Sequence, residues 1–166
     1  MFDCGFMKEN YWFRYRAAAI IIEDNCVLFA SNNTVDYFYS IGGAVKTGET
    51  AEDAVIREVL EETGILYEID KLAVIHENFF YEEKFVNELN SKQKVNCHEV
   101  CFYYLMKPKG IQQLNSNSYT HGTKENMCWL PIKDLDKYKA FPTFMKDYLN
   151  KEHNEIVHIV TDERFL

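Results

Sequence analysis

Apolar residues occur along the chain in several strand-length runs. From Arg16 the run AAAIII is continuous, polar residues interrupt it at 23–25, and Cys26–Ala30 resumes it. Two apolar runs joined by a short polar break predict a β-hairpin. After a polar loop over Ser31–Asp36, the aromatic run Tyr37–Ile41 predicts another strand. This strand leads into two adjacent glycines, where the backbone can turn sharply or approach a ligand closely.

A helix is predicted between residues 50 and 64, because both of its ends carry signals. Thr50 is a typical N-cap with Asp53 three residues later, and Gly64 is a typical stop. The helix should therefore span Ala51–Thr63. At about 100° per residue, one face should pack in the core and the other should carry carboxylates beside small alanines, which leave room for a ligand. The expected packing face holds Val55, Ile56, Val59 and Leu60, and the other face holds Ala51, Ala54, Glu58, Glu61 and Glu62.

The remainder of the chain predicts further strands and a second helix. A charged connection over 82–94 separates two strand-like pieces, of which the second is expected to be central in a sheet. A segment rich in Asn, Ser and Gly predicts a mobile loop, and Trp129 is expected to open a new element. The ranges are Leu66–Phe80 and Val95–Met106 for the strands, Gly110–Thr123 for the loop, about Pro142–Asn150 for the helix and Ile156–Val160 for a final strand.

Length and composition favour one soluble, cytoplasmic domain over residues 1–166. A chain of 166 residues has the size of one domain, and no apolar run approaches the roughly 18 residues of a membrane span. No signal peptide is recognisable at the N-terminus. The five cysteines form no C-x-x-C pair, which suits reduced thiols. A net charge of −8 disfavours a stable complex with nucleic acid, but acidic side chains can hold metals that bind small phosphorylated ligands.

Three glutamates project from one turn of the predicted helix. Glu58, Glu61 and Glu62 stand at positions i, i+3 and i+4, so their carboxylates share a small region. The ordinary explanation of such a cluster is a solvated acidic face. The functional alternative is a site for a hard cation, because dense oxygen ligands suit Mg²⁺ or Mn²⁺.

The residues around these glutamates favour the metal site. Gly43 is followed after five residues by Glu49, and after seven more by Arg57-Glu58-Val59, one residue, Glu61-Glu62, one residue and Gly64-Ile65. This segment, Gly43 to Ile65, resembles the Nudix box of MutT-like Nudix hydrolases at all nine of its defined positions. The resemblance implies an α/β fold in which a mixed sheet is sandwiched between helices (α/β/α). Ile41 stands where the family often has proline before the two glycines.

The resemblance also implies a chemistry. Glu58, Glu61 and Glu62 would coordinate Mg²⁺, or Mn²⁺ in its place, with Gly43 beside them and Glu58 as candidate general base. Glu49 can reach Arg57 and hold the loop and the helix in one orientation. Bound metal would polarise phosphorus and lower the pKa of the attacking water. The implied reaction is substitution by water at a phosphorus of a P–O–P bridge.

A further carboxylate is expected after the box, as in many relatives of the family. Glu125 is the favoured candidate, because it lies in the predicted loop four residues before Trp129. Glu99 is the alternative. It should sit on a strand, where a surface-facing charge needs no functional explanation.

The substrate is predicted only as a class. Arg14 and Arg16 should share a strand face and could meet a phosphate, or could pair on the surface. Tyr81 stands where diadenosine polyphosphate hydrolases have a marker tyrosine, and Phe80 replaces the marker proline of many ADP-ribose pyrophosphatases. We expect a small nucleotide-type substrate, first a (modified) nucleoside triphosphate, with ADP-ribose, nucleotide sugars and dinucleoside polyphosphates as alternatives.

Two other classes of function remain beside hydrolysis. A silent ligand-sensing Nudix domain would be expected to lose metal ligands, whereas Glu58, Glu61 and Glu62 are all present. An isomerase on the same fold is disfavoured by the complete hydrolase signature. A homodimer is also considered, with the segment before Arg16 as one interface.

Overall fold

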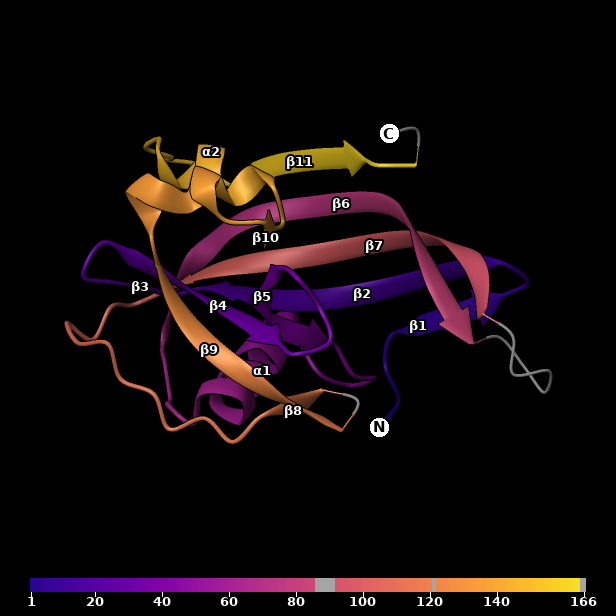
Figure 1. The fold of residues 1–166 in the computed structure, drawn as a ribbon, viewed down its shortest axis with the longest axis horizontal. Helices are drawn as coiled ribbons and strands as arrows, with labels where there is room; N and C mark the ends of the chain where they lie inside the picture. Colours follow the sequence, from indigo (N-terminus) through magenta and orange to yellow (C-terminus); the bar gives the residue numbers. More distant parts are fainter. Residues whose placement is uncertain (86–91, 121, 165–166) are drawn as a thin grey trace.

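The structure is a computed structural model that describes residues 1–85, 92–120 and 122–164 (Figure 1). Its helical elements are α1 (Ala51–Thr63), the 3₁₀ helix η1 (Ile132–Lys137) and α2 (Phe144–Leu149). The strands of this part of the chain are β1 (Gly5–Lys8), β2 (Tyr11–Ile20), β3 (Ile22–Glu23), β4 (Cys26–Asn32), β5 (Phe38–Ala44), β6 (Ile69–Phe85), β7 (Lys92–Met106), β8 (Tyr119–Thr120), β9 (Thr123–Pro131), β10 (Ala140–Phe141) and β11 (Val157–Asp162).

The strands form one mixed sheet with helices on both faces. Its order is β11-β6-β7-β2-β5-β4-β9-β8, with β1 paired to β2, β3 to β4 and β10 to β5. The pairs β2–β7 and β6–β11 are parallel, whereas β6–β7 and β2–β5 are antiparallel. The helix α1 packs on one face, and η1 and α2 lie on the other, beside β6 and β11 in Figure 1. The expected α/β/α arrangement is therefore confirmed, and β7 is central as predicted.

The run of small and branched residues in β2 supplies both faces of the sheet. Side chains alternate along a strand, so Ala17 and Ala19 pack in the core under α1, whereas Ala18 and Ile20 pack in the core under α2. All four are at most 2% exposed. A strand buried on both faces reads as a continuous apolar run, which explains the pattern seen in the sequence.

The predicted bounds of α1 are confirmed, but its faces are rotated from the prediction. The Thr50 hydroxyl accepts a hydrogen bond from the Asp53 amide at 3.1 Å, and Gly64 ends the helix with φ of 71°. Ala54 is fully buried and Leu60 is 45% exposed, opposite to the prediction for both. Ala51 is also in the core. The small alanines therefore allow close packing of α1 on the sheet, and they do not line a ligand site.

Other boundaries differ where tertiary pairing extends a strand. The predicted hairpin is present as β3 and β4, but Gly42 and Gly43 lie inside β5 and do not form a turn. The strands β6 and β7 continue well into the charged segment expected to connect them, and the middle of that segment, 86–91, lies outside the described residues. Trp129 is near the end of β9 and does not open a new element.

The segment expected to be a mobile loop is tied to the fold at several points. Both carboxylate oxygens of Glu23, which is 2% exposed, accept backbone hydrogen bonds, from Lys109 at 2.6 Å and from Gly110 at 2.8 Å. Further along, the Asn115 amide donates to the Thr63 carbonyl at 2.8 Å, at the end of α1. The segment also begins to pair at Tyr119 and Thr120, which form β8.

In the described part of the chain, no helix has both the length and the apolar character required to cross a membrane.

A buried histidine predicts how the stability depends on pH. His76 is 1% exposed, its Nε2 lies 2.8 Å from the Thr161 hydroxyl, and burial lowers its pKa to about 4 from 6.5. The unfolded chain therefore binds a proton below pH 6.5 that the folded chain binds only near pH 4. We expect the free energy of unfolding to fall between these pH values by up to about 3 kcal/mol. Denaturant titrations of the wild type and of His76→Gln should show a flatter pH dependence in the variant, and equal slopes would contradict this assignment.

Candidate functional site

The backbone of β5 passes directly against α1 and β2 at Gly42 and Gly43. The Gly42 amide donates to Glu62 Oε1 at 2.9 Å, and its carbonyl accepts from Arg16 Nη2 at 2.6 Å. A Cβ atom at Gly43 would overlap the Glu58 carboxyl group, and one at Gly42 would overlap β2. Gly43 therefore allows Glu58 of α1 to lie against the strand backbone, and Gly42 allows the close approach of β2.

Glu62 is an unusual buried carboxyl group. It is 8% exposed, and its burial raises its pKa to about 8. The Gly42 amide opposes this increase, while the charges of Glu125 and Glu58 add to it. Loss of solvation and neighbouring like charges both disfavour an ionised carboxylate. A cation beside Glu62 would have the opposite effect.

Arg57 connects the loop before α1 with the carboxylates of the helix. It donates to both carboxylate oxygens of Glu49, at 2.8 and 3.0 Å, and its hydrogen bonds lower the pKa of Glu49 to about 2. Its Nη2 also donates to the Ala44 carbonyl at 3.1 Å, and its Nη1 to Glu58 at 2.5 Å and Glu61 at 3.3 Å. The expected contact between Glu49 and Arg57 is thus present. It fixes the loop, β5 and α1 relative to one another.

Glu125 bonds to β5 through the Tyr39 hydroxyl group, on the same strand that binds Glu62 at Gly42, and its charge helps to raise the pKa of Glu62. It is 5% exposed and stands on β9. Its carboxylate accepts hydrogen bonds from three hydroxyl groups: Tyr39 at 2.5 Å, Ser118 at 2.6 Å and Thr120 at 2.9 Å.

Glu99 has different surroundings from Glu125, and the expectation of a surface-facing charge was wrong. It is 3% exposed on β7 and forms an ion pair with Arg14, while Arg16 Nη1 lies 3.7 Å away. The side chains of Arg14 and Arg16 are 26% and 20% exposed, so this pairing is largely buried. Glu99 therefore neutralises one of two guanidinium groups beside β5.

The predicted substrate residues are only partly brought together with the carboxylates. Arg16 reaches Gly42, whereas the Arg14 guanidinium lies 4.7 Å from the Trp12 ring centroid and 5.5 Å from that of Phe80. Tyr81 is 40% exposed on β6, with the Lys94 ammonium 3.8 Å from its ring centroid. Among the described residues, Tyr81 has no contact with the glutamates of α1.

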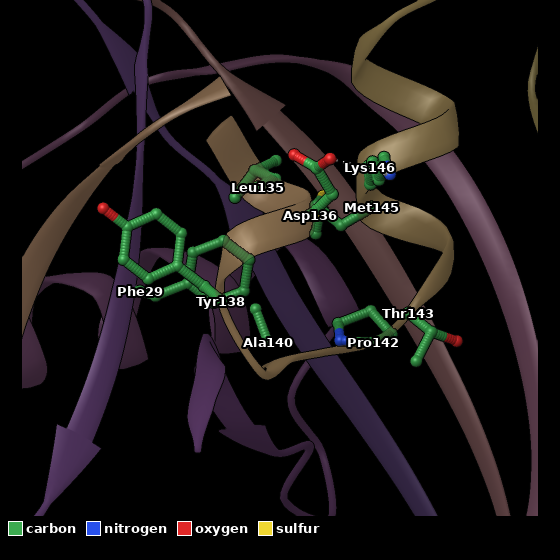
Figure 2. Close-up of a pocket in the computed structure, with 9 residues that line it drawn as sticks. All are labelled: Phe29, Leu135, Asp136, Tyr138, Ala140, Pro142, Thr143, Met145 and Lys146. Carbon is green, nitrogen blue, oxygen red and sulfur yellow. Dashed lines mark ion pairs between the residues drawn. The ribbon is translucent and has the colours of Figure 1, made fainter. Parts of the chain in front are cut away.

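A hollow on the other face of the sheet is separate from these groups. Figure 2 shows its lining between η1 and α2, where Phe29, Leu135 and Met145 enclose about 140 Å³. Asp136 and Lys146 form an ion pair at 3.8 Å within this lining. None of the predicted site residues contributes to it.

Comparisons with known proteins decide the family. The profile of the NUDIX domain matches residues 12–151. The chain belongs to the NUDIX family. This membership confirms the family expected from the sequence. It also confirms the expectation that the chain is an enzyme that hydrolyses phosphoric anhydride bonds. Among curated proteins, none matches the sequence significantly.

Solved structures with the NUDIX fold resemble the chain at low sequence identity. A MutT NUDIX hydrolase from Burkholderia pseudomallei is 19% identical, with 85% of this chain and 98% of that chain covered and a TM-score of 0.54. A MutT protein from Methanosarcina mazei is 17% identical, with 87% and 94% covered and a TM-score of 0.59. An ADP-ribose pyrophosphatase from Streptococcus suis is 18% identical, with 87% and 98% covered and a TM-score of 0.56. These similarities support the fold and leave the substrate open.

The residues of the NUDIX box suit an open divalent-metal site. Within the described ranges, no group of three or more His, Cys, Asp or Glu side chains is arranged to hold a metal ion without other ligands. Arg57 forms ion pairs with Glu58 and Glu61, and the side chain of Glu61 is 57% exposed. Mg²⁺ commonly keeps several waters and takes only one or two carboxylates together with substrate phosphates. Oxygen donors at Glu58 and Glu62, with the space that Gly43 leaves beside Glu58, fit this mode of binding.

Sequence reasoning missed the hydroxyl groups around Glu125. Tyr39 was considered only as an aromatic residue of a strand, and Ser118 and Thr120 only as residues of a loop. Their positions depend on the pairing of β8 with β9 and of β4 with β5 and β9. The sequence carries no local signal for these contacts.

The raised pKa of Glu62 predicts that metal affinity increases with pH. Below about pH 8 the carboxyl group carries a proton that a divalent cation must displace. We expect the affinity for Mn²⁺ to increase up to about tenfold per pH unit between pH 6 and 8, and to level off above that range. Isothermal titration in buffers of different ionisation enthalpy would measure both affinity and proton release. Retention of this full pH dependence by Glu62→Gln would contradict the assignment.

The contact at Gly43 predicts the effect of adding one methyl group. In Gly43→Ala the new Cβ should displace the Glu58 carboxylate, and we expect hydrolysis and Mn²⁺ affinity each to fall about tenfold or more. Gly48→Asn is the matched control, because the site is open and Asn tolerates its φ of 82°. Thermal unfolding should show both variants folded, and normal Mn²⁺ binding by folded Gly43→Ala would refute the role of this contact.

Proposed function

We propose that the chain is a Mg²⁺-dependent pyrophosphohydrolase, also able to use Mn²⁺, whose substrate is a nucleoside triphosphate or a modified one. The observation that carries this proposal is the junction at Gly42. There a buried carboxyl group, Glu62, accepts from the amide of Gly42, and a partly buried guanidinium group, Arg16, donates to the carbonyl of the same residue. A carboxyl group that we propose as a metal ligand and a cationic side chain thus bond to the same residue, which supports cleavage of a phosphoric anhydride.

Each residue of the site has a proposed role in this reaction. Glu58, Glu61 and Glu62 would hold the divalent cation, which would neutralise the diphosphate and lower the pKa of the attacking water. Glu58 would be the candidate general base for that water, and Arg57 holds its carboxylate beside Gly43. Glu49 fixes Arg57, and Glu125 contributes a further carboxylate.

The cluster of Arg14, Arg16 and Glu99 supports a phosphorylated substrate. Arg14 and Arg16 share the single carboxylate of Glu99, so these three side chains together have a net charge of +1, and Arg16 also donates to the Gly42 carbonyl. Because this charge is largely buried, its attraction for a phosphate oxygen is screened less than that of a surface lysine. We propose that Arg16 faces the substrate's phosphates and that Glu99 orients both arginines. The role of Tyr81 stays a prediction.

The names of two of the similar structures mention other substrates. One is named an ADP-ribose pyrophosphatase and another a UDP-X diphosphatase, the latter 12% identical to this chain with a TM-score of 0.54. A silent ligand-sensing domain is the alternative of another class. The complete set of Glu58, Glu61 and Glu62 favours an active hydrolase over it. One domain over residues 1–166, a homodimer and a cytoplasmic location stay predictions.

A substrate panel tests this function. The protein should be incubated with Mg²⁺ and, separately, with nucleoside triphosphates, modified nucleoside triphosphates, ADP-ribose, nucleotide sugars and dinucleoside polyphosphates, and the products identified by mass spectrometry. We expect a nucleoside triphosphate to yield the monophosphate and pyrophosphate, with no turnover in EDTA. Faster turnover of another class would move the substrate to that class, and no turnover of any would favour a sensor.

Variants of α1 test the assignment of the metal-binding glutamates. We expect Glu61→Gln and Glu62→Gln each to lower kcat/KM by about a hundredfold, because each removes a negatively charged oxygen ligand. Glu52→Gln is the matched control, since Glu52 is an exposed glutamate in the first turn of the same helix. The thermal midpoints of all three should stay close to that of the wild type. Full activity in both Glu61→Gln and Glu62→Gln would refute the site.

A further inference from the structure

A directed chain of hydrogen bonds ends on Glu125. The Thr34 amide, which can only donate, donates to Asn32 Oδ1 at 2.9 Å, and the Thr34 hydroxyl donates to the same oxygen at 2.6 Å. This fixes the orientation of the Asn32 side-chain amide, since its oxygen must face Thr34. Its Nδ2 then donates to the Tyr39 hydroxyl oxygen at 3.1 Å. The Tyr39 proton is left to point at Glu125 Oε1, 2.5 Å away.

The three elements of this chain are held in register by the sheet. Asn32 pairs directly with Glu125 between β4 and β9, and Ala30 pairs with Tyr39 between β4 and β5. Asn32, Tyr39 and Glu125 therefore stand on three neighbouring strands, and Thr34 lies in the turn directly after β4. Tyr39 itself is packed against the core under α1. A hydroxyl group held in this way directs its hydrogen bond without a large cost in side-chain entropy.

The hydroxyl donors leave Glu125 with little freedom. An ionised carboxylate offers about four lone-pair positions. Glu125 Oε1 accepts from Tyr39 and Thr120, and Oε2 accepts from Ser118, so one position on Oε2 remains. Glu125 and Glu62 both bond to β5, Glu125 through the Tyr39 hydroxyl group and Glu62 through the Gly42 amide three residues later.

We propose that Tyr39 is the positioning residue of Glu125: the relay from Thr34 through Asn32 aims the Tyr39 proton at Oε1, and so presents the remaining Oε2 lone pair to the metal site. The inference rests on the proposed function, because it assigns how one carboxylate of that site is oriented. Outer hydrogen-bond partners of such carboxylates typically contribute about 10–100-fold to metal affinity or activity.

Metal binding without substrate tests the role of Tyr39. Mn²⁺ affinity of the full chain should be measured by electron paramagnetic resonance for the wild type, Tyr39→Phe, Glu125→Gln and the double variant. We expect Tyr39→Phe to bind Mn²⁺ about tenfold more weakly than the wild type. In the Glu125→Gln background the same substitution should change affinity less than twofold, because Tyr39 acts only through Glu125. Equal losses in both backgrounds would overturn the proposal.

Tyr67→Phe is the matched control for loss of a buried tyrosine hydroxyl. Tyr67 is 2% exposed and its hydroxyl donates to the buried Glu23 at 3.5 Å, away from the glutamates of α1. It should keep Mn²⁺ affinity within twofold of the wild type. If Tyr67→Phe loses as much affinity as Tyr39→Phe, the effect is structural and the proposal fails. Should Tyr39→Phe not fold, Ser118→Ala removes another donor from Glu125 and should also lose its effect in the Glu125→Gln background.

Turnover separates this inference from the proposed function. With a hydrolysed substrate, Tyr39→Phe should lower kcat about tenfold and leave KM within twofold. A wild type that binds Mn²⁺ but hydrolyses nothing would contradict the proposed function, and the Mn²⁺ cycle would still decide the role of Tyr39. A wild type that binds no Mn²⁺ would overturn both.

Discussion

The close approach of β5 to α1 and β2 at Gly42 and Gly43 is the contact on which the site depends. Here the backbone of a strand takes the place that side chains occupy elsewhere in the core, so that Glu62 can bond to an amide and Glu58 can lie beside Gly43. A buried acidic group and a partly buried one would otherwise be costly to accommodate. The carbonyl oxygen of the same residue, Gly42, accepts a hydrogen bond from Arg16. One strand residue thus links the acidic and the basic parts of the site.

The charges around this contact are only partly balanced, and this favours the binding of a metal ion. Arg57 compensates Glu49 and approaches Glu58 and Glu61, whereas Glu62 has an amide partner and a raised pKa. Arg14 and Arg16 share Glu99 on the other side of Gly42. Carboxylates without a full set of cationic partners attract divalent cations, and excess guanidinium charge attracts phosphate. The carboxylates therefore attract a cation and the arginines attract an anion, and a metal–phosphate complex provides both.

Sequence reasoning succeeded where the signals are local. The bounds of α1 follow from Thr50 and Gly64, and the contact between Glu49 and Arg57 follows from the spacing of the box. It failed where neighbouring strands decide the outcome. Leu60 is exposed and Ala54 buried because the sheet requires a small residue at the closest approach of the helix. Glu99 is buried because β7 lies beside β2 and its arginines, a pairing far apart in sequence. The hydroxyl groups on Glu125 likewise come from β5, from β8 and from the residue before β8.

The connection between β7 and β8 has a consequence for how the enzyme could be re-engineered. It is fastened at Lys109 and Gly110 by Glu23, at Asn115 by the end of α1, and at Ser118 by Glu125. Only two residues separate the attachments at Asn115 and Ser118. Residues 111–114, between the attachments at Gly110 and Asn115, are exposed. Grafted recognition segments would therefore be accommodated at 111–114. An insertion after Asn115 would instead displace Ser118 and change the position of the Glu125 carboxylate.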